Sequence, residues 1–204
     1  MPRIRPFEPS DLDTLYVISL ETGHEGGDAS HLYADKKLIG HIYSAPYALL
    51  EPECALVVED ADGVAGFAVG ALDTVMWHQR LEREWWPSLR SVYEDPGDTP
   101  LPSWSADQRR TFVIHHPAPP PRLVVENYPA HLHLNLRPRI QGKGVGRLIF
   151  LEWLFNATRR GAERFHVGAN RANLRAIEFW ARQGFELLPN SAKEATNTVW
   201  MGRS

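Results

Sequence analysis

The sequence predicts a single α/β domain, and three observations support that class. Its 204 residues are 43% hydrophobic, 10% aromatic and 23% charged, which is a globular composition and excludes wholesale disorder. A chain of this length usually folds as one domain and buries a sizeable core without disulfides. β-rich runs and segments of helical periodicity follow one another along the chain, and in the C-terminal third they alternate regularly.

The N-terminal part predicts a strand, a helix and a hairpin. Ser10 is a favourable N-cap, and the apolar positions that follow have helical spacing until Gly23. Two later β-rich runs are joined by a turn that contains Asp62-Gly63, a typical hairpin signal. The expected elements lie at residues 4–7 (strand), 10–22 (helix), 31–39 (helix within a loop), 55–58 (strand) and 64–72 (strand).

The middle of the chain is expected to be an insertion within one domain. Residues 1–204 should form a single unit, with a helical and proline-rich insertion around residues 73–122. Residues 74–93 have a helical pattern, and the proline-rich stretches at 95–102 and 116–121 are too short to separate domains. We expect this insertion to decide which substrate is used. Its tryptophans either line a substrate pocket or pack in the core, and core packing is the favoured interpretation: Trp77, Trp85, Trp86 and Trp104.

The C-terminal third contains a strand that leads into a glycine-rich turn and then a helix. Residues 131–136 alternate between a leucine face and a polar face, and Gly142, Gly144 and Gly146 follow before a helix over 148–158. Such a turn lets backbone N–H groups converge on a phosphate at a helix N-terminus. The glycine spacing fits neither the dinucleotide fingerprint nor the Walker A loop. A strand at 164–169, a helix at 173–183 and a closing strand at 198–201 complete the prediction.

Two sequence runs resemble the GCN5-related N-acetyltransferases (GNAT). LRPRIQGKGVG (136–146) is similar to that family's coenzyme A loop, V-x-P-x-x-[QR]-G-x-G-x-[GA], with leucine for valine as the departure. NLRAIEFWARQGF (173–185) is similar to its second motif, N-x-x-A-[IL]-x-[FL]-Y-x-x-x-G-[FY], with Trp180 in place of tyrosine. The resemblance implies the GNAT fold, a mixed central sheet flanked by helices, in which strands 131–136 and 164–169 splay apart at the acetyl-CoA site.

The resemblance also implies which residues bind acetyl-CoA, the expected co-substrate. The backbone of Leu134 and Leu136 should pair with the pantetheine arm, the loop N–H groups should hold the pyrophosphate, and Asn173 should bind the arm or its neighbouring backbone. Asn173 also suits a helix N-cap, and the charges of Lys143 and Arg147 can equally be plain solvated groups. The expected cofactor-binding set is Leu134, Leu136, Gln141, Gly142, Lys143, Gly144, Val145, Gly146, Arg147, Asn173 and Phe179.

The expected catalytic residues are His133, Asn135 and Trp180. His133 shares a strand face with Asn135, and an imidazole titrates near neutral pH, which suits a general base. A packed structural histidine is the alternative, and Glu126 and Tyr128 compete for the role of base. Trp180 replaces a tyrosine that can protonate the leaving thiolate, and an indole N–H is no practical acid. His131 and His133 lack an evident third ligand, so no metal site is predicted.

The expected activity is acetyl transfer from acetyl-CoA directly to a primary amine, a small molecule or a peptide. The alternative is an acetyl-CoA-binding pseudo-acetyltransferase or interaction module, and a scaffold that does not bind coenzyme A is a third possibility. Trp180 motivates the alternative. So does the run NYPAHL (127–132), which resembles the acetyltransferase-like C-terminal domain of animal O-GlcNAc hydrolases, a domain with free-standing bacterial relatives. The animal domains are regarded as having lost cofactor binding, whereas the glycine loop here is complete.

Charge and hydropathy narrow the expected partners. Residues 137–204 carry a balance of +7 and residues 1–136 a balance of −10, so a bound anion is favoured over nucleic acid, given a sequence pI of about 6.3. No apolar run approaches the ~20 residues that span a bilayer, and no signal-peptide core is evident, so a cytoplasmic protein without membrane contact is expected. Cys54 is the single cysteine, which excludes an internal disulfide. A monomer or homodimer is expected.

Overall fold

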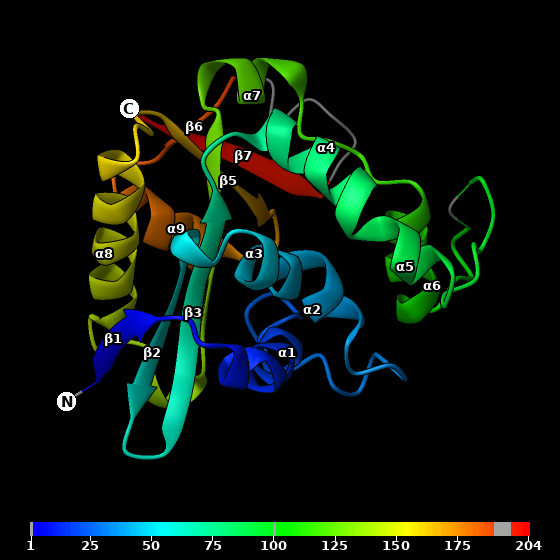
Figure 1. The fold of residues 1–204 in the computed structure, drawn as a ribbon, viewed down its shortest axis with the longest axis horizontal. Coiled ribbons are helices and arrows are strands. Elements are labelled where there is room, and N and C mark those ends of the chain that lie inside the picture. Colours follow the sequence, from blue (N-terminus) through cyan, green and yellow to red (C-terminus); the bar gives the residue numbers. More distant parts are fainter. Residues whose placement is uncertain (1, 100, 190–196) are drawn as a thin grey trace.

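A computed structural model describes residues 2–99, 101–189 and 197–204, which form a mixed seven-stranded sheet between two groups of helices (Figure 1). The strand order is β1-β2-β3-β4-β5-β7-β6. Every neighbouring pair is antiparallel except β4 and β5, which are parallel. The strands are β1 (Arg3–Pro6), β2 (Ala55–Asp60), β3 (Gly63–Ala71), β4 (Ala130–Leu136), β5 (Phe165–Asn170), β6 (Glu186–Leu187) and β7 (Thr198–Arg203). The α/β class and the mixed sheet predicted from the sequence are confirmed.

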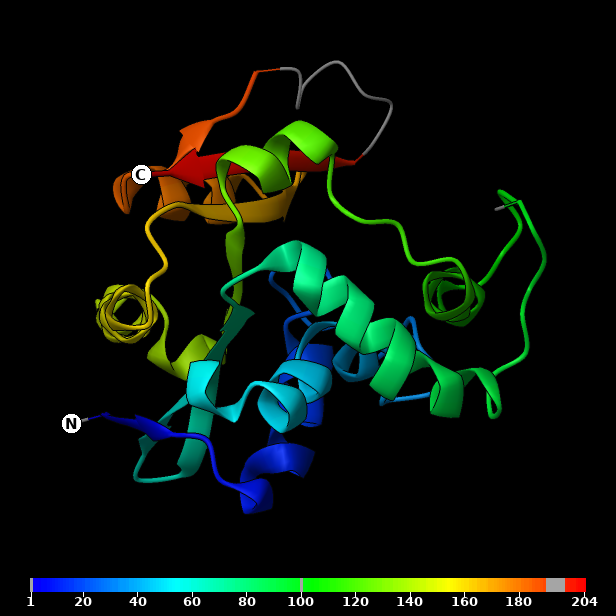
Figure 2. The same cartoon turned by 45° about the horizontal axis from the view of Figure 1, so that its top comes forward.

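The helices cover both faces of the sheet and create two hydrophobic clusters. Helices α1 to α6 pack on one face, and α8 and α9 contribute to the cluster on the other; Figure 2 shows α8 end-on, across the sheet from α4. The helices are α1 (Leu12–Glu21), α2 (Leu38–Tyr43), α3 (Ala45–Leu50), α4 (Thr74–Glu84), α5 (Trp86–Arg90), α6 (Ala106–His115), α7 (Arg122–Asn127), α8 (Val145–Arg159) and α9 (Leu174–Arg182). Short 3-10 turns span Pro9–Asp11, Pro52–Cys54 and Pro138–Ile140.

Some helix boundaries differ from the sequence prediction for identifiable reasons. The helix expected over 74–93 is two helices that break at Trp85, because Pro87 in the first turn of α5 has no N–H to continue the ladder. Ser10 is not an N-cap; it lies inside the 3-10 turn, where the Asp11 carboxylate accepts the Glu8 N–H at 2.9 Å. The helix expected at 31–39 begins only at Leu38 as α2, and α3, α7 and β6 were not predicted.

Strand β4 is held along one edge and largely released along the other. Six consecutive residue pairs join it to β3, from Gly66↔Leu136 to Ala71↔His131. Its pairing with β5 is limited to Ala130↔Phe165 and His131↔His166, after which the two strands part. The splay expected from the family resemblance is therefore present.

Gly70 of β3 permits close packing of Trp153 from α8, since a Cβ there would lie 2.5 Å from the indole ring.

Candidate active site

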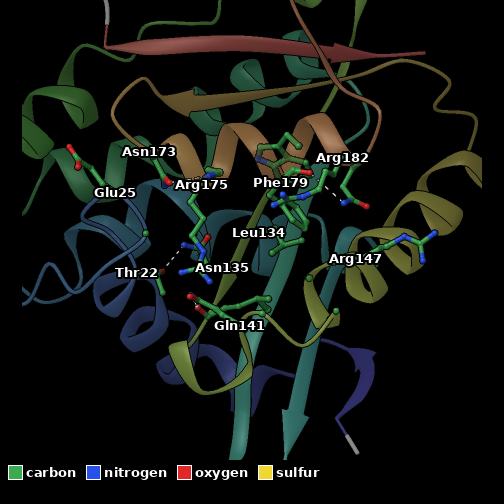
Figure 3. Close-up of a pocket in the computed structure, with 18 residues that line it drawn as sticks. Thr22, Glu25, Leu134, Asn135, Gln141, Arg147, Asn173, Arg175, Phe179 and Arg182 are labelled. Carbon is green, nitrogen blue, oxygen red and sulfur yellow. Dashed lines mark hydrogen bonds between the residues drawn. The ribbon is translucent and has the colours of Figure 1, made fainter.

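A cavity of about 820 Å³ opens where β4 and β5 separate (Figure 3). The end of α1, the turn after it, the C-terminal end of β4, the glycine loop and α9 form its walls. Most of the cofactor-binding residues expected from the sequence line it: Leu134, Leu136, Gln141, Gly142, Gly144, Gly146, Arg147, Asn173 and Phe179. Val145, the first residue of α8, is instead buried in the hydrophobic cluster, and the Lys143 ammonium donates to the Arg139 carbonyl at 2.8 Å on the surface.

The glycine loop has the backbone conformation of an anion site. Gly142 and Gly144 have φ values of +72° and +79°, a region that L side chains rarely adopt. Gly144 is the N-cap of α8, and no side chain caps that helix within the described residues. The N–H groups of the first turn of this 15-residue helix therefore point outward without an intrahelical partner, where an anion can accept them.

Side chains around the loop fix its position against the rest of the fold. The Gln141 amide donates to the Leu136 carbonyl at 2.6 Å, which ties the loop back to the end of β4. Arg139 forms a fork on the Asp60 carboxylate at 2.8 and 3.0 Å, and this pair lowers the pKa of Asp60 to about 2. A Cβ at Gly146 would lie 3.1 Å from the Phe179 ring, so α8 and α9 approach closely at the cavity floor.

Helix α9 supplies the opposite wall. The Asn173 side chain accepts the Ala176 N–H at 3.0 Å, so it acts as the N-cap of α9 while it also lines the cavity. Trp180 lines the same wall, with an exposed fraction of 7%, and its indole packs edge-on against Phe150. Two arginines of this helix also line the cavity, as Figure 3 shows for Arg175 and Arg182.

The polar face of β4 borders the cavity at one end and is buried at the other. Asn135 lines the cavity and donates to the Thr22 hydroxyl at 2.7 Å. His133, one position further from the glycine loop on this face, is half-buried, and its Nε2 lies 3.2 Å from the Tyr47 hydroxyl. His131 is buried, with an exposed fraction of 7%.

Burial keeps the histidines of this region neutral. It lowers the pKa of His133 and His166 to about 4 and that of His131 well below its usual range, because the charged form loses its hydration. The neighbouring histidines oppose protonation further. Neutral imidazoles are the form that can accept a proton.

The two residues that compete with His133 for the role of base, Glu126 and Tyr128, are engaged in other contacts. Glu126 pairs with Arg122 on the exposed side of α7 at 2.6 Å. The Tyr128 ring packs directly against Gly202, leaving no room for a side chain there, and the Tyr128 carbonyl lies 2.6 Å from His166 Nδ1.

Two of the tryptophans considered for a substrate pocket are in the core. Trp77 and Trp86 have exposed fractions of 2% and 3% in the hydrophobic cluster, which is the core packing favoured from the sequence.

Sequence reasoning missed the residues that come from the α1 end and from inside α9. Thr22, Glu25 and Gly26 line the cavity from the turn after α1, and Arg175 and Arg182 line it from α9. Glu25 has φ +53° and is followed by Gly26 at +87°, so the glycine pair after it was the available signal for a tight turn. The described residues contain no group of three or more His, Cys, Asp or Glu side chains placed to hold a metal ion. None of the described helices is both long enough and apolar enough to cross a membrane.

Comparison with solved structures identifies the class of protein. The fold matches PaiA N-acetyltransferase from Thermoplasma acidophilum, solved in complex with coenzyme A, with a TM-score of 0.59 at 15% identity over 100% of this chain and 99% of that one. SsHAT matches with a TM-score of 0.87 at 31% identity, over 100% of this chain and 98% of that one. The match to PaiA shows that the fold is shared. The match to SsHAT at 31% identity over nearly the whole of both chains, together with the two motifs around the cavity, establishes that the chain belongs to the GNAT family.

Curated relatives agree with the second resemblance. Protein O-GlcNAcase of Rattus norvegicus and of Mus musculus is 22% identical over 98% of this chain. The chain spans about a fifth of the length of these relatives, since the match covers 22% of each. No protein-family model matches the chain.

Proposed function

We propose that this protein is an acetyl-CoA-dependent N-acetyltransferase that transfers the acetyl group directly to a primary amine. One observation carries the proposal: a single cavity joins the open edge of β4 to the uncapped N-terminus of α8. A long ligand with amide groups along its length and phosphates at one end matches that combination. The same ligand class is bound by the PaiA N-acetyltransferase.

The residues present fit this co-substrate. The backbone of Leu134 to Leu136 has no partner on β5 among the described residues, so it can pair with amides as an added strand does. The glycine loop from Gly142 to Arg147 and the N-terminus of α8 supply N–H groups for the expected pyrophosphate. Arg147 and Arg182 also line the cavity and bring positive charge to it, and Arg182 is at the same time paired with Glu178 at 3.7 Å. Bound acetyl-CoA supplies an activated acetyl thioester.

Residues on the polar face of β4 then serve the acceptor amine. The amine lone pair attacks the thioester carbonyl carbon, a C–N bond forms, the C–S bond breaks and the electron pair leaves on sulfur. His133 lies outside the residues that line the cavity, two positions from Asn135 on the same strand face. We assign it the proton released from the amine nitrogen, which it passes to solvent, and an edge N–H near Leu136 polarises the carbonyl. Asn135, beside the cavity, orients the acceptor.

The leaving thiolate needs no strong acid in this scheme. A free thiol has a pKa of about 8.5, so its anion is an acceptable leaving group that later takes a proton from solvent. Trp180 accordingly shapes the wall of the cavity and donates no proton. The presence of Trp180 where the resembled family has a tyrosine is the observation that favours the second candidate function, an acetyl-CoA-binding protein without turnover.

Calorimetric titration with acetyl-CoA, followed by thiol release in the presence of a panel of primary amines, tests the proposal. Binding with amine-dependent thiol release is the expected result. Binding without thiol release from any amine would favour the non-catalytic alternative. No binding at millimolar acetyl-CoA would refute both.

A further inference from the structure

A chain of hydrogen bonds runs beneath the polar face of β4 and ends on His133. The Thr74 hydroxyl donates to the Pro129 carbonyl at 2.7 Å and lies 2.7 Å from His131 Nδ1. The Tyr47 hydroxyl lies 2.8 Å from His131 Nε2 and 3.2 Å from His133 Nε2. We call these five residues the β4 hydrogen-bond chain. They join α3, the start of α4 and β4 through side chains that are 57 to 86 positions apart in sequence.

The direction of the chain is fixed at its Pro129 end. The Pro129 carbonyl oxygen only accepts, and it already receives the Thr74 backbone N–H at 2.8 Å. The Thr74 hydroxyl oxygen lies 2.7 Å from the same carbonyl oxygen, and two oxygens that close repel each other unless a proton lies between them, so we place the hydroxyl proton there. The Thr74 oxygen therefore presents a lone pair to His131, and His131 Nδ1 must carry a proton to make that 2.7 Å contact. His131 is neutral because burial lowers its pKa, so its Nε2 carries none.

The remaining two links follow by the same elimination. The bare His131 Nε2 accepts the proton of the Tyr47 hydroxyl at 2.8 Å. The Tyr47 oxygen then has lone pairs left for His133, so the contact at 3.2 Å requires the proton on His133 Nε2. Neutral His133 consequently has its lone pair on Nδ1, and that atom makes no hydrogen bond within the described residues.

We propose that Tyr47 and Thr74 are positioning residues for acetyl transfer, because the chain holds His133 in the Nε2–H tautomer and leaves Nδ1 as the atom that accepts the amine proton. This inference rests on the proposed function, in which His133 is the base. Tyr47 suits this role because it is firmly held: its exposed fraction is 5%, and it stacks on Trp77 with ring centroids 4.3 Å apart. His131 cannot serve in place of His133, since both of its ring nitrogens are already occupied.

Nuclear magnetic resonance of the histidine-labelled protein tests the chain without relying on activity. Long-range correlations between ring protons and ring nitrogens identify the tautomer, and the His133→Gln variant assigns the signals. We expect opposite tautomers at neutral pH, Nδ1–H for His131 and Nε2–H for His133. The Nδ1–H form is the minor one for histidine in water, so its presence at His131 would be informative. A proton on Nδ1 of His133 would overturn the proposal.

Two variants test the direction of the chain. Thr74→Val removes the hydroxyl that His131 Nδ1–H needs, so His131 should leave the Nδ1–H form, whereas Thr74→Ser should retain it. An unchanged His131 tautomer in Thr74→Val would overturn the assigned direction. Thermal melts confirm that each variant is folded.

Kinetics test the positioning role, with Tyr43→Phe as the matched control for Tyr47→Phe. Tyr43 contacts the same imidazole edge-on at 5.6 Å, but its hydroxyl accepts from Arg110 and lies outside the chain. Tyr47→Phe should lower kcat by about ten-fold or more at an unchanged KM for acetyl-CoA, against ~100-fold for His133→Gln. Equal kcat values in Tyr47→Phe and Tyr43→Phe would overturn the positioning role. If His133→Gln turned over normally, the proposal that His133 is the base would be refuted. The tautomer spectra would still test the direction of the hydrogen bonds separately.

Discussion

Replacing Gly144 by leucine should separate cofactor binding from folding, with Gly161→Leu as the matched control. Both glycines flank α8, have positive φ (+79° and +95°), and have nothing within 4 Å of an added Cβ. An L-residue in this region costs about 1–2 kcal/mol, which for a chain of this size lowers the melting temperature by roughly 2–8 °C. The stability cost should therefore be similar at the two ends of the helix.

The two variants should differ in acetyl-CoA affinity. At Gly144 the new side chain stands over the free N–H groups of α8, and the loss of two charge-assisted hydrogen bonds at about 1.5 kcal/mol each raises Kd by about 100-fold. Gly161 lies beyond the C-terminus of α8, so its replacement should leave Kd unchanged. Calorimetric titration and thermal denaturation of both variants measure the two effects. A folded Gly144→Leu protein with wild-type affinity would refute the pyrophosphate site and the reasoning from the glycine loop.

Three further predictions concern the other walls of the cavity. Trp180→Phe should keep kcat within about three-fold, since the indole gives up no proton; a much larger loss would point to the N–H. Burial lowers the pKa of His133 from its ordinary 6.5 to about 4, so His133 stays neutral and kcat should not fall between about pH 7 and pH 5.5. The free energy of unfolding should fall as the pH drops from 6.5 towards 4, because His133 binds a proton more tightly in the unfolded chain. Asn173→Ala should lower the free energy of unfolding by about 1 kcal/mol because the helix loses its cap, and Asn173→Ser should restore the cap and the stability. If acetyl-CoA affinity stays weak in the serine variant, Asn173 contacts the ligand directly. Full recovery of affinity would exclude that contact.

The sequence was most informative where a local conformation demands a particular residue. Positive φ at Gly142 and Gly144 restricts those positions to glycine, so the sequence marked the loop as an anion-binding turn, and the resemblance to the two GNAT motifs assigned it to coenzyme A. Asn173 caps α9 with its own side chain, and the alternation of β4 separates its leucine face from its polar face. These features depend on neighbours within a few residues, which is why the cofactor half of the site followed from the motifs.

Contacts between distant segments lay beyond sequence reasoning. Thr22 reaches Asn135 across 113 positions, and Tyr47 reaches His131 across 84, and no periodicity encodes either pairing. The break at Trp85 was missed because the apolar spacing continues through Pro87 as though the helix did. The proposed acceptor side of the site is assembled from such contacts, so the sequence could name His133 without its partners.

The β4 hydrogen-bond chain bears on whether the protein is an enzyme or a binding module. Buried polar groups stabilise a fold only modestly even when fully paired, and apolar residues of similar volume often pack as well in their place. A module that only binds coenzyme A needs the open edge of β4 and the glycine loop, both of which lie on the side of the leucines. It has no need for neutral, oriented histidines on the opposite face. Thr74 and Tyr47 pack against the histidines of that face, and the direction that we propose for their hydrogen bonds is the one that proton transfer to His133 needs. This proposed arrangement is our reason to favour catalysis over binding alone.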